Sequence, residues 1–133
     1  MGIYVAKKLM AEMNKKKIKI KDANILIMGL TFKENCADTR NSGIEKVVSE
    51  LKKFNCNLDL YDPWADHQDI KKKYGILPKS KLDKNTYDVI LIAVAHDNFK
   101  NMGIKAVLNL CKKKYIIYDL KYTFNSSRVN LRL

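Results

Sequence analysis

The polar segment at residues 29–42 carries the side chains whose types and spacing best suit ligand binding. It places Lys33 and Arg40 between an apolar run that ends at Gly29 and an amphipathic segment that begins at Ser42. Backbone N–H groups and the helix dipole favour phosphate at the start of a helix, and two cations add to that attraction. The residues therefore favour phosphate binding, and a solvated connecting loop is the alternative. Because the segment lacks Gly-x-Gly-x-x-Gly, it is not expected to bind a dinucleotide in the usual way.

Several other side chains could take part in chemistry, but each has a simpler interpretation. His96 follows an apolar run, where it could be catalytic or could cap the next helix. Cys36 would need a neighbouring base to act as a nucleophile, and no histidine is near it in sequence. Asp119 and Lys121 follow the last apolar run, so they either line the same site as Lys33 or pair with each other. Trp64, after Asp62-Pro63, is expected to pack rather than to stack on a ligand.

Composition limits the classes of protein to which the chain could belong. The 133 residues carry a formal net charge of +12, mostly from lysine, since arginine occurs only at positions 40, 128 and 132. Base readout and bidentate phosphate clamps favour arginine, so we expect no specific nucleic-acid binding, although a polyanion-binding module stays as an alternative. No apolar run approaches the roughly 20 residues of a membrane span. Three cysteines without metal-ligand spacing favour reduced thiols and a cytoplasmic location.

Hydrophobic periodicity predicts helices that alternate with short strands. Ser42-x-x-Glu45 is expected to form a capping box at the start of one helix. The predicted helices comprise 3–15 with the apolar positions Ile3, Ala6, Leu9, Met10 and Met13, 42–54 with Ile44, Val47, Val48, Leu51 and Phe54, 66–74, and a last helix marked by Ile104, Val107, Leu108 and Cys111. The predicted strands are 24–28, 57–61, a stub at 76–77, 88–95 and 115–119, after which the chain is expected to be irregular to Leu133.

This alternation predicts an α/β fold with a parallel sheet, helices on both faces and one preceding helix. A domain boundary is expected near Lys21, which divides the chain into residues 1–21, a helix and connector entering from outside, and residues 22–133, the α/β unit. Ligands of such sheets bind beyond the carboxyl ends of the strands, near the point where strand order reverses. The segment 29–42 is therefore the leading candidate site.

The same segment resembles a known family signature. Gly29-Leu30-Thr31-Phe32-Lys33-Glu34-Asn35-Cys36-Ala37-Asp38-Thr39-Arg40-Asn41-Ser42 is similar to the signature of the carboxyl-terminal domain of the UDP-glucose/GDP-mannose dehydrogenases. Tyr61-Asp62-Pro63, Ala93-Val94-Ala95-His96 and Asp119-Leu120-Lys121 fall where that family has similar segments. Within the signature, the residues Phe32-Lys33-Glu34-Asn35-Cys36 most resemble those of the UDP-N-acetylhexosamine 6-dehydrogenases of surface-polysaccharide synthesis, although Ala37 stands where those enzymes often have proline.

The resemblance implies a Rossmann-like UDP-sugar-binding domain of a larger NAD-dependent enzyme. In that family an amino-terminal domain binds NAD, and the sugar's C6 alcohol is oxidised to a carboxylate through a cysteine thioester. Carried over by position, Phe32 and Lys33 would contact the UDP-sugar, Lys121 would lie near the substrate, and Arg40 would reach NAD across the cleft. Residues 1–15 would end the helix that joins the two domains, and the full-length enzyme would be a homodimer. The alternatives are a basic nucleic-acid-binding module and a nucleotide-binding regulatory module.

The resemblance also predicts that this chain is catalytically silent by itself. None of its three cysteines stands in a Gly-Gly-x-Cys context, and no dinucleotide fingerprint is present. We expect the purified chain to form no NADH from NAD and any UDP-sugar, measured by absorbance. Turnover by the pure protein would contradict this expectation.

Overall fold

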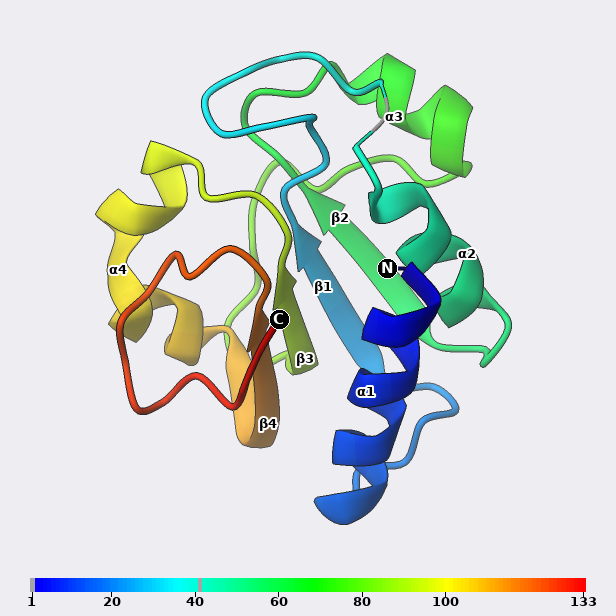
Figure 1. Cartoon of the computed structure of the whole chain (residues 1–133), viewed down its shortest axis with the longest axis vertical. Coiled ribbons are helices and arrows are strands. Elements are labelled where there is room, and N and C mark those ends of the chain that lie inside the picture. Colours follow the sequence, from blue (N-terminus) through cyan, green and yellow to red (C-terminus); the bar gives the residue numbers. More distant parts are fainter. Residues whose placement is uncertain (1, 41) are drawn as a thin grey trace.

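Parallel pairing of five short strands organises the chain (Figure 1). The computed structural model describes residues 2–40 and 42–133. The sheet has the order β2-β1-β3-β4-β5, and every neighbouring pair is parallel. The strands are β1 (Asn24–Met28), β2 (Asn57–Tyr61), β3 (Tyr87–Ile92), β4 (Cys111–Asp119) and β5 (Leu131–Arg132).

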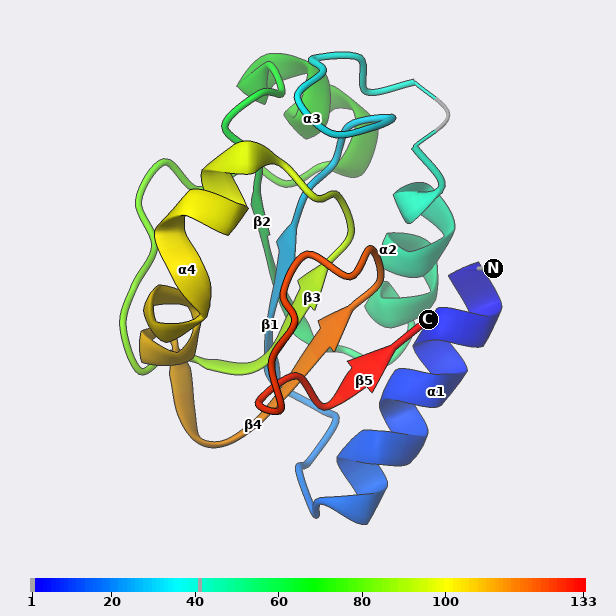
Figure 2. The same cartoon turned by 60° about the vertical axis from the view of Figure 1, so that its left-hand side comes forward.

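Helices cover both faces of the sheet, which gives three layers (Figure 2). They are α1 (Gly2–Lys15), α2 (Ile44–Lys52), α3 (His67–Tyr74) and α4 (Asp97–Asn109). Along β1, Ile25 and Ile27 are buried with α1, α2 and α3, whereas Leu26 and Met28 are buried with α4. Successive strand residues face opposite sides, so an uninterrupted apolar strand can feed both cores. The predicted α/β class, with helices on both faces and a preceding helix, is confirmed.

Two predicted helices differ in detail at their ends. Helix α2 begins with Gly43 as its N-cap, in the left-handed conformation with φ of 78°, and no side chain caps it within the described residues. The predicted Ser42–Glu45 capping box is therefore wrong, because Ser42 lies one residue before the cap and the Glu45 carboxylate pairs with Lys73 at 2.6 Å. The helix ends at Lys52, so Phe54 lies outside it and does not belong to its apolar face as predicted. Phe54 is 42% exposed.

In α1, the predicted Ile3 is 53% exposed, and Gly2 and Val5 are buried in the helix face instead. The contact at Gly2 explains this difference. A β-carbon there would meet Lys46 of α2, so the two helices approach closely along the Gly2 side. Side by side, α1 and α2 form one layer of the molecule (Figure 1).

The carboxyl-terminal half differs more from the prediction. Helix α4 begins already at Asp97 and bends at Gly103 (φ 83°, ψ 160°), and Cys111 belongs to β4 rather than to the helix. The predicted strand stub at Ile76-Leu77 is not a strand, and the predicted irregular tail contains β5. These elements are short or broken by glycine, so their periodicity carries little information.

Gly29 directly follows β1 and lies against Val94 in the loop after β3. Its φ is +103°, and a β-carbon would lie 2.7 Å from both the backbone nitrogen and Cβ of Val94. We therefore expect Gly29→Ala to lower the free energy of unfolding by more than about 2 kcal/mol, from left-handed strain and a backbone clash.

Gly75→Ala is the matched control for this substitution. Gly75 also has positive φ (+73°), but a β-carbon there would meet no other part of the chain within 4 Å, so only about 1 kcal/mol of strain is expected. Urea unfolding followed by circular dichroism compares the two variants. Equal losses of stability would show that the contact with Val94 does not constrain Gly29.

Candidate functional site

The reversal of strand order beside β1 creates the site. Strand β1 pairs with β2 on one side and with β3 on the other, and Met28 is in register with both Tyr61 and Ile92. The chain leaving β1 continues to α2 on one face, whereas the chain leaving β3 continues to α4 on the other face. Because the two loops diverge, a gap opens at the carboxyl edge of the sheet, which is where ligands of such sheets bind.

A cavity of about 110 Å³ lies in this gap. It is smaller than the roughly 300–1,000 Å³ of pockets that enclose a whole ligand. It therefore accommodates one group of a larger ligand and leaves the remainder uncovered by this chain. Its lining residues are Thr31, Phe32, Lys33, Glu34, Ser42, Ile44, Ala93, Val94, Ala95, Leu120, Lys121 and Leu133.

Three of the four predicted site residues meet at this cavity. Phe32 and Lys33 come from the β1–α2 loop, and Lys121 comes from the turn after β4. Phe32 is 57% exposed, and both lysines are exposed. Within the described part of the chain, neither Lys33 nor Lys121 has a carboxylate within ion-pairing distance. Glu34 also lines the cavity, but two lysines without an ion pair beside an apolar ring suit a ligand that is both anionic and apolar.

The fourth predicted residue, Arg40, does not line the cavity. Its side chain is 85% exposed and binds Asp38 in bidentate fashion, with Nε–Oδ1 and Nη2–Oδ2 distances of 3.0 Å. The side-chain hydrogen bond from Arg40 lowers the pKa of Asp38 to about 2. Arg40 is thus held in a fixed orientation at the outer surface of the loop.

The amino terminus of α2 also reaches the cavity. Ser42 and Ile44, on either side of the N-cap Gly43, are among the lining residues. The N-cap Gly43 has no side chain to cap the helix, and the start of a helix carries partial positive charge that attracts an anion. This feature supports the expectation of phosphate binding, although the predicted Ser42 cap is absent.

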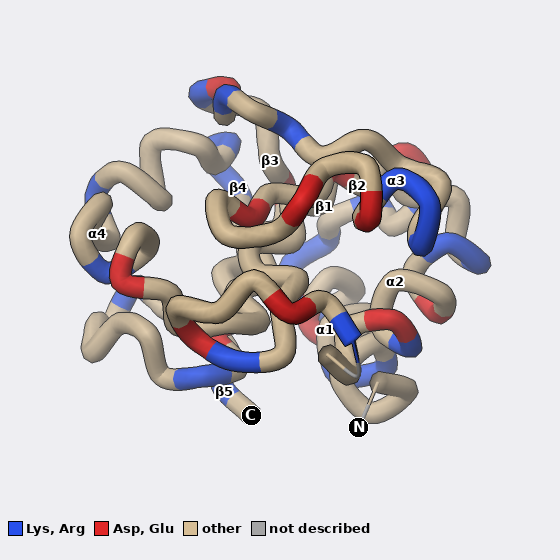
Figure 3. Tube along the Cα trace, turned by 90° about the horizontal axis from the view of Figure 1, so that it is seen from above, with Lys and Arg blue, Asp and Glu red and all other residues tan. Residues whose placement is uncertain are grey.

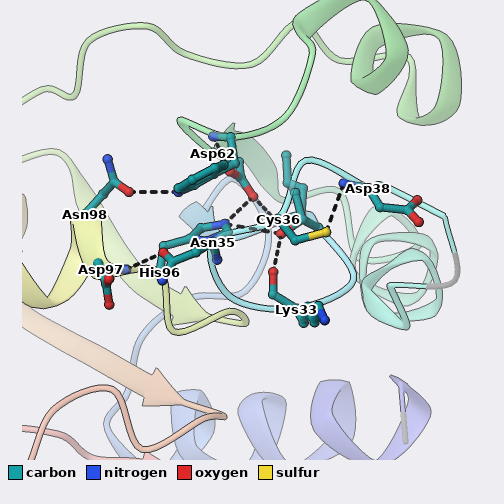
Figure 4. A network of polar contacts seen from close by, with 11 residues as sticks. Lys33, Asn35, Cys36, Asp38, Asp62, His96, Asp97 and Asn98 are labelled. Carbon is teal, nitrogen blue, oxygen red and sulfur yellow. Dashed lines mark hydrogen bonds and ion pairs between the residues drawn. The ribbon is translucent and has the colours of Figure 1, made fainter.

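Behind the loop lies a buried polar cluster that the sequence did not predict (Figure 4). The Asp62 carboxylate accepts hydrogen bonds from the backbone N–H groups of Leu30 (2.7 Å) and Trp64 (2.8 Å). Its Oδ2 atom also lies 3.0 Å from Nε2 of His96. Asp62 and His96 are 1% and 0% exposed. The cluster thus ties together the loops that follow β1, β2 and β3.

His96 occupies the N-cap position of α4, but its side chain makes no capping bond. The alternative that His96 caps the next helix is therefore confirmed in its position, although its side chain makes no capping bond. The Asn35 side chain caps the start of α4 instead, since its Oδ1 accepts a hydrogen bond from the Asp97 N–H at 3.0 Å. The sequence signal for this cluster was the polar residue that follows each of two strands consecutive in the sequence, namely Asp62 after β2 and His96 after β3.

Asp119 orders the turn that carries Lys121. Its carboxylate is fully buried and accepts from the backbone N–H groups of Lys121 (3.3 Å), Thr123 (3.0 Å) and Phe124 (2.9 Å). Asp119 thus uses the backbone of Lys121 rather than its ammonium group. Of the two sequence alternatives for this pair, the structure favours the one in which Lys121 lines the site.

The two remaining candidates have structural contacts. Trp64 stacks on the His96 ring, with centroids 6.1 Å apart, and donates a hydrogen bond to Asn98 at 2.9 Å. Trp64 therefore packs on His96, as the sequence suggested, although 41% of the residue is exposed. The Cys36 sulfur accepts from the Asp38 N–H at 3.5 Å. Among the described residues, no group of His, Cys, Asp and Glu could hold a metal ion.

Basic residues lie at several separate places around the molecule, with acidic residues among them (Figure 3). The densest group surrounds an open depression at the amino edge of the sheet and contains Lys17, Lys19, Lys21 and Lys112–Lys114. Asp88 lies within it and pairs with Lys112 at 3.2 Å. No described helix is long and apolar enough to cross a membrane.

The strand order and the cationic cavity define a nucleotide-binding type of α/β domain. Residues 26–126 match the UDP-glucose/GDP-mannose dehydrogenase family, UDP binding domain. The chain belongs to this family, as its loop signature suggested.

Relatives of this chain are longer enzymes. It is 43% identical to the UDP-N-acetyl-D-glucosamine 6-dehydrogenases of Salmonella typhi and Pseudomonas aeruginosa, over its whole length but only 31% and 32% of theirs. The structure of a UDP-D-ManNAc dehydrogenase from Pyrococcus horikoshii superposes with a TM-score of 0.73 at 25% identity, covering 98% of this chain and 29% of that one. The chain thus spans about a third of the relatives that it matches.

The Asp38–Arg40 pair provides a pH-dependent test of the loop's geometry. Since the pKa of Asp38 is lowered from 3.8 to about 2, its contribution to stability is present above pH 3.8 and is lost as the pH falls through about 2. We expect Arg40→Gln to raise this pKa toward 3.8, measured by NMR titration of the side-chain carboxyl.

Arg128→Gln, which removes another exposed arginine, should leave the pKa of Asp38 unchanged. If Arg40→Gln also left it near 2, Arg40 would not be the partner that holds Asp38 ionised.

Proposed function

We propose that this chain is the UDP-sugar-binding domain of an NAD-dependent nucleotide-sugar 6-dehydrogenase. The observation that carries the proposal is the cavity at the strand-order reversal, which Phe32, Lys33 and Lys121 line together. Lys33 and Lys121 attract the diphosphate, and the amino terminus of α2 adds partial positive charge. Phe32 offers an apolar surface to the base or the sugar.

The relatives support a particular class of sugar. The two bacterial enzymes that are 43% identical over the whole chain are UDP-N-acetyl-D-glucosamine 6-dehydrogenases. A further relative, 34% identical over 129 residues, is a UDP-N-acetyl-D-mannosamine dehydrogenase from Methanocaldococcus jannaschii. A UDP-N-acetylhexosamine, oxidised to its uronic acid for surface polysaccharide, is therefore the substrate that we assign to the parent enzyme.

The other half of the active site belongs to a partner domain in this proposal. That domain binds NAD and supplies the catalytic cysteine, and the parent enzyme is a cytoplasmic homodimer. Arg40 is exposed, and its pair with Asp38 uses only Nε and Nη2, so its Nη1 atom is the one that can meet a dinucleotide on a facing surface. Residues 1–21 form the joint to that domain, and residues 22–133 form the UDP-sugar unit. The small volume of the cavity supports a site that two domains share.

Lys33→Ala tests the proposed site directly. We expect the chain to bind UDP with an affinity of about 1 mM, because it supplies only part of the contacts. Loss of the Lys33 ammonium should remove a charge-assisted hydrogen bond of roughly 1.5–3 kcal/mol and weaken binding by at least about tenfold. The dissociation constant follows from an NMR titration with UDP.

Lys113→Ala removes the same charge from an exposed position in the basic group at the amino edge. It should leave the affinity for UDP within about twofold, because only distant, screened electrostatics change. Similar weakening in both variants would indicate non-specific attraction by the positive charge of the chain. An unchanged affinity in a folded Lys33→Ala variant would exclude Lys33 from the site.

A further inference from the structure

The imidazole of His96 lies behind the cavity and does not line it. The ring is fully buried, between Trp64 on one side and Phe99, whose ring meets it edge-on at 5.3 Å, on the other. The proposed binding of UDP therefore gives His96 no direct role. A buried polar ring is costly unless its nitrogens are hydrogen-bonded, and here both nitrogens have partners.

The contacts of His96 fix its tautomer. The Asn35 backbone N–H lies 2.9 Å from Nδ1, and a backbone N–H can only donate. Nδ1 must therefore carry the lone pair, and in the neutral ring the proton is on Nε2. That proton faces Asp62 Oδ2 at 3.0 Å and Thr31 Oγ1 at 3.2 Å.

The same ring thus holds the loop on both sides of Lys33. On one side, the single Nε2 proton is shared between Asp62 Oδ2 at 3.0 Å and Thr31 Oγ1 at 3.2 Å, and Thr31 Oγ1 donates its own proton to the Lys33 carbonyl at 3.0 Å. On the other side, the Asn35 N–H donates to Nδ1. Asn35 has φ of 55°, a left-handed conformation that asparagine tolerates better than most residues. Figure 4 shows this chain of contacts from His96 to the segment that carries Lys33.

We propose that His96 is a positioning residue for the nucleotide site. By anchoring Thr31 and Asn35 through its two nitrogens, it sets the backbone that places Phe32 and Lys33 at the cavity, without touching the ligand itself. Asp62 orients the ring, since it accepts the Nε2 proton while it also binds the N–H groups of Leu30, in the loop after β1, and of Trp64, in its own loop. The nucleotide part of this proposal rests on the function proposed above, whereas the anchoring of the loop does not.

Two substitutions by amide side chains distinguish the role of Nδ1 of His96 from the role of Nε2. The side-chain oxygen of asparagine can reach the place of Nδ1 and accept from the Asn35 N–H, whereas the longer side chain of glutamine can place its NH₂ group near Nε2 and donate to Asp62. His96→Asn thus keeps the bond to Asn35, and His96→Gln loses it. Both variants keep a polar group in the buried position, so folding is expected, and circular dichroism verifies it.

Amide hydrogen exchange of the whole chain, followed by NMR, is the deciding experiment. In His96→Gln the Asn35 amide should exchange roughly 3- to 10-fold faster than in the wild type, as expected for the loss of one hydrogen bond. In His96→Asn its exchange should stay within about twofold, and the amide of Ile90 in β3 should be unchanged in both variants. Unchanged exchange at Asn35 in His96→Gln, or equal acceleration in both variants, would overturn the anchoring role.

UDP titrations of the same samples test the consequence for binding. His96→Gln should weaken UDP binding by roughly 3- to 10-fold, and His96→Asn should weaken it less. A residue that only fills the core would lower stability without changing the affinity of the folded protein, so unchanged affinity in a folded His96→Gln variant would also overturn the proposal. If the wild type failed to bind UDP, the proposed function would fail, while exchange at Asn35 would still decide whether His96 anchors the loop.

Discussion

The buried carboxylate of Asp62 is the interaction on which the carboxyl edge of the sheet depends. It accepts one hydrogen bond from each of three loops, through Leu30 after β1, Trp64 after β2 and His96 after β3. A carboxylate away from water is costly unless donors replace its hydration, and three donors do so here. Loops that would otherwise move independently are thereby fixed relative to one another at the point where strand order reverses.

The close approach of the loops that Asp62 connects explains which residues stand at positions 29 and 35. Gly29 allows β1 to end against Val94, since any side chain there would meet the backbone of the neighbouring loop. Asn35 takes a left-handed conformation and bonds the first N–H of α4 through its side chain. These contacts are satisfied within the chain, whereas Lys33 and Lys121 form no ion pair with any described residue at the cavity. The hydrogen-bonded residues thus lie behind the cavity, whereas Lys33 and Lys121 line it.

The parts of the fold with strong periodicity could be predicted from the sequence. The apolar run of β1 and the stripe Ile44, Val47, Val48 and Leu51 of α2 are buried as their patterns indicated. The meeting of Lys33 with Lys121 followed from the rule that parallel strands end at the same edge. The two-residue strand β5 escaped prediction, and the bounds of the predicted helix α4 were wrong because Gly103 interrupts its periodicity.

The polar cluster escaped prediction for a different reason. Its members lie far apart in the sequence, with Thr31 and His96 separated by 65 positions, and only the fold brings them together. The Ser42–Glu45 motif predicted a capping box that does not form, because Lys73, on another helix, binds the glutamate that the box would need. Local patterns predict elements well, but the partner of a single polar side chain is a property of tertiary structure.

The central claim is that the cavity at the strand-order reversal binds the uridine diphosphate group. An NMR titration of the isotopically labelled chain with UDP tests it most directly. We predict saturable shifts confined to the amides of residues 31–34, Val94 and Lys121, and none at Lys112–Lys114 on the opposite edge. Shifts centred on Lys112–Lys114, or no saturable shift at residues 31–34, would contradict it.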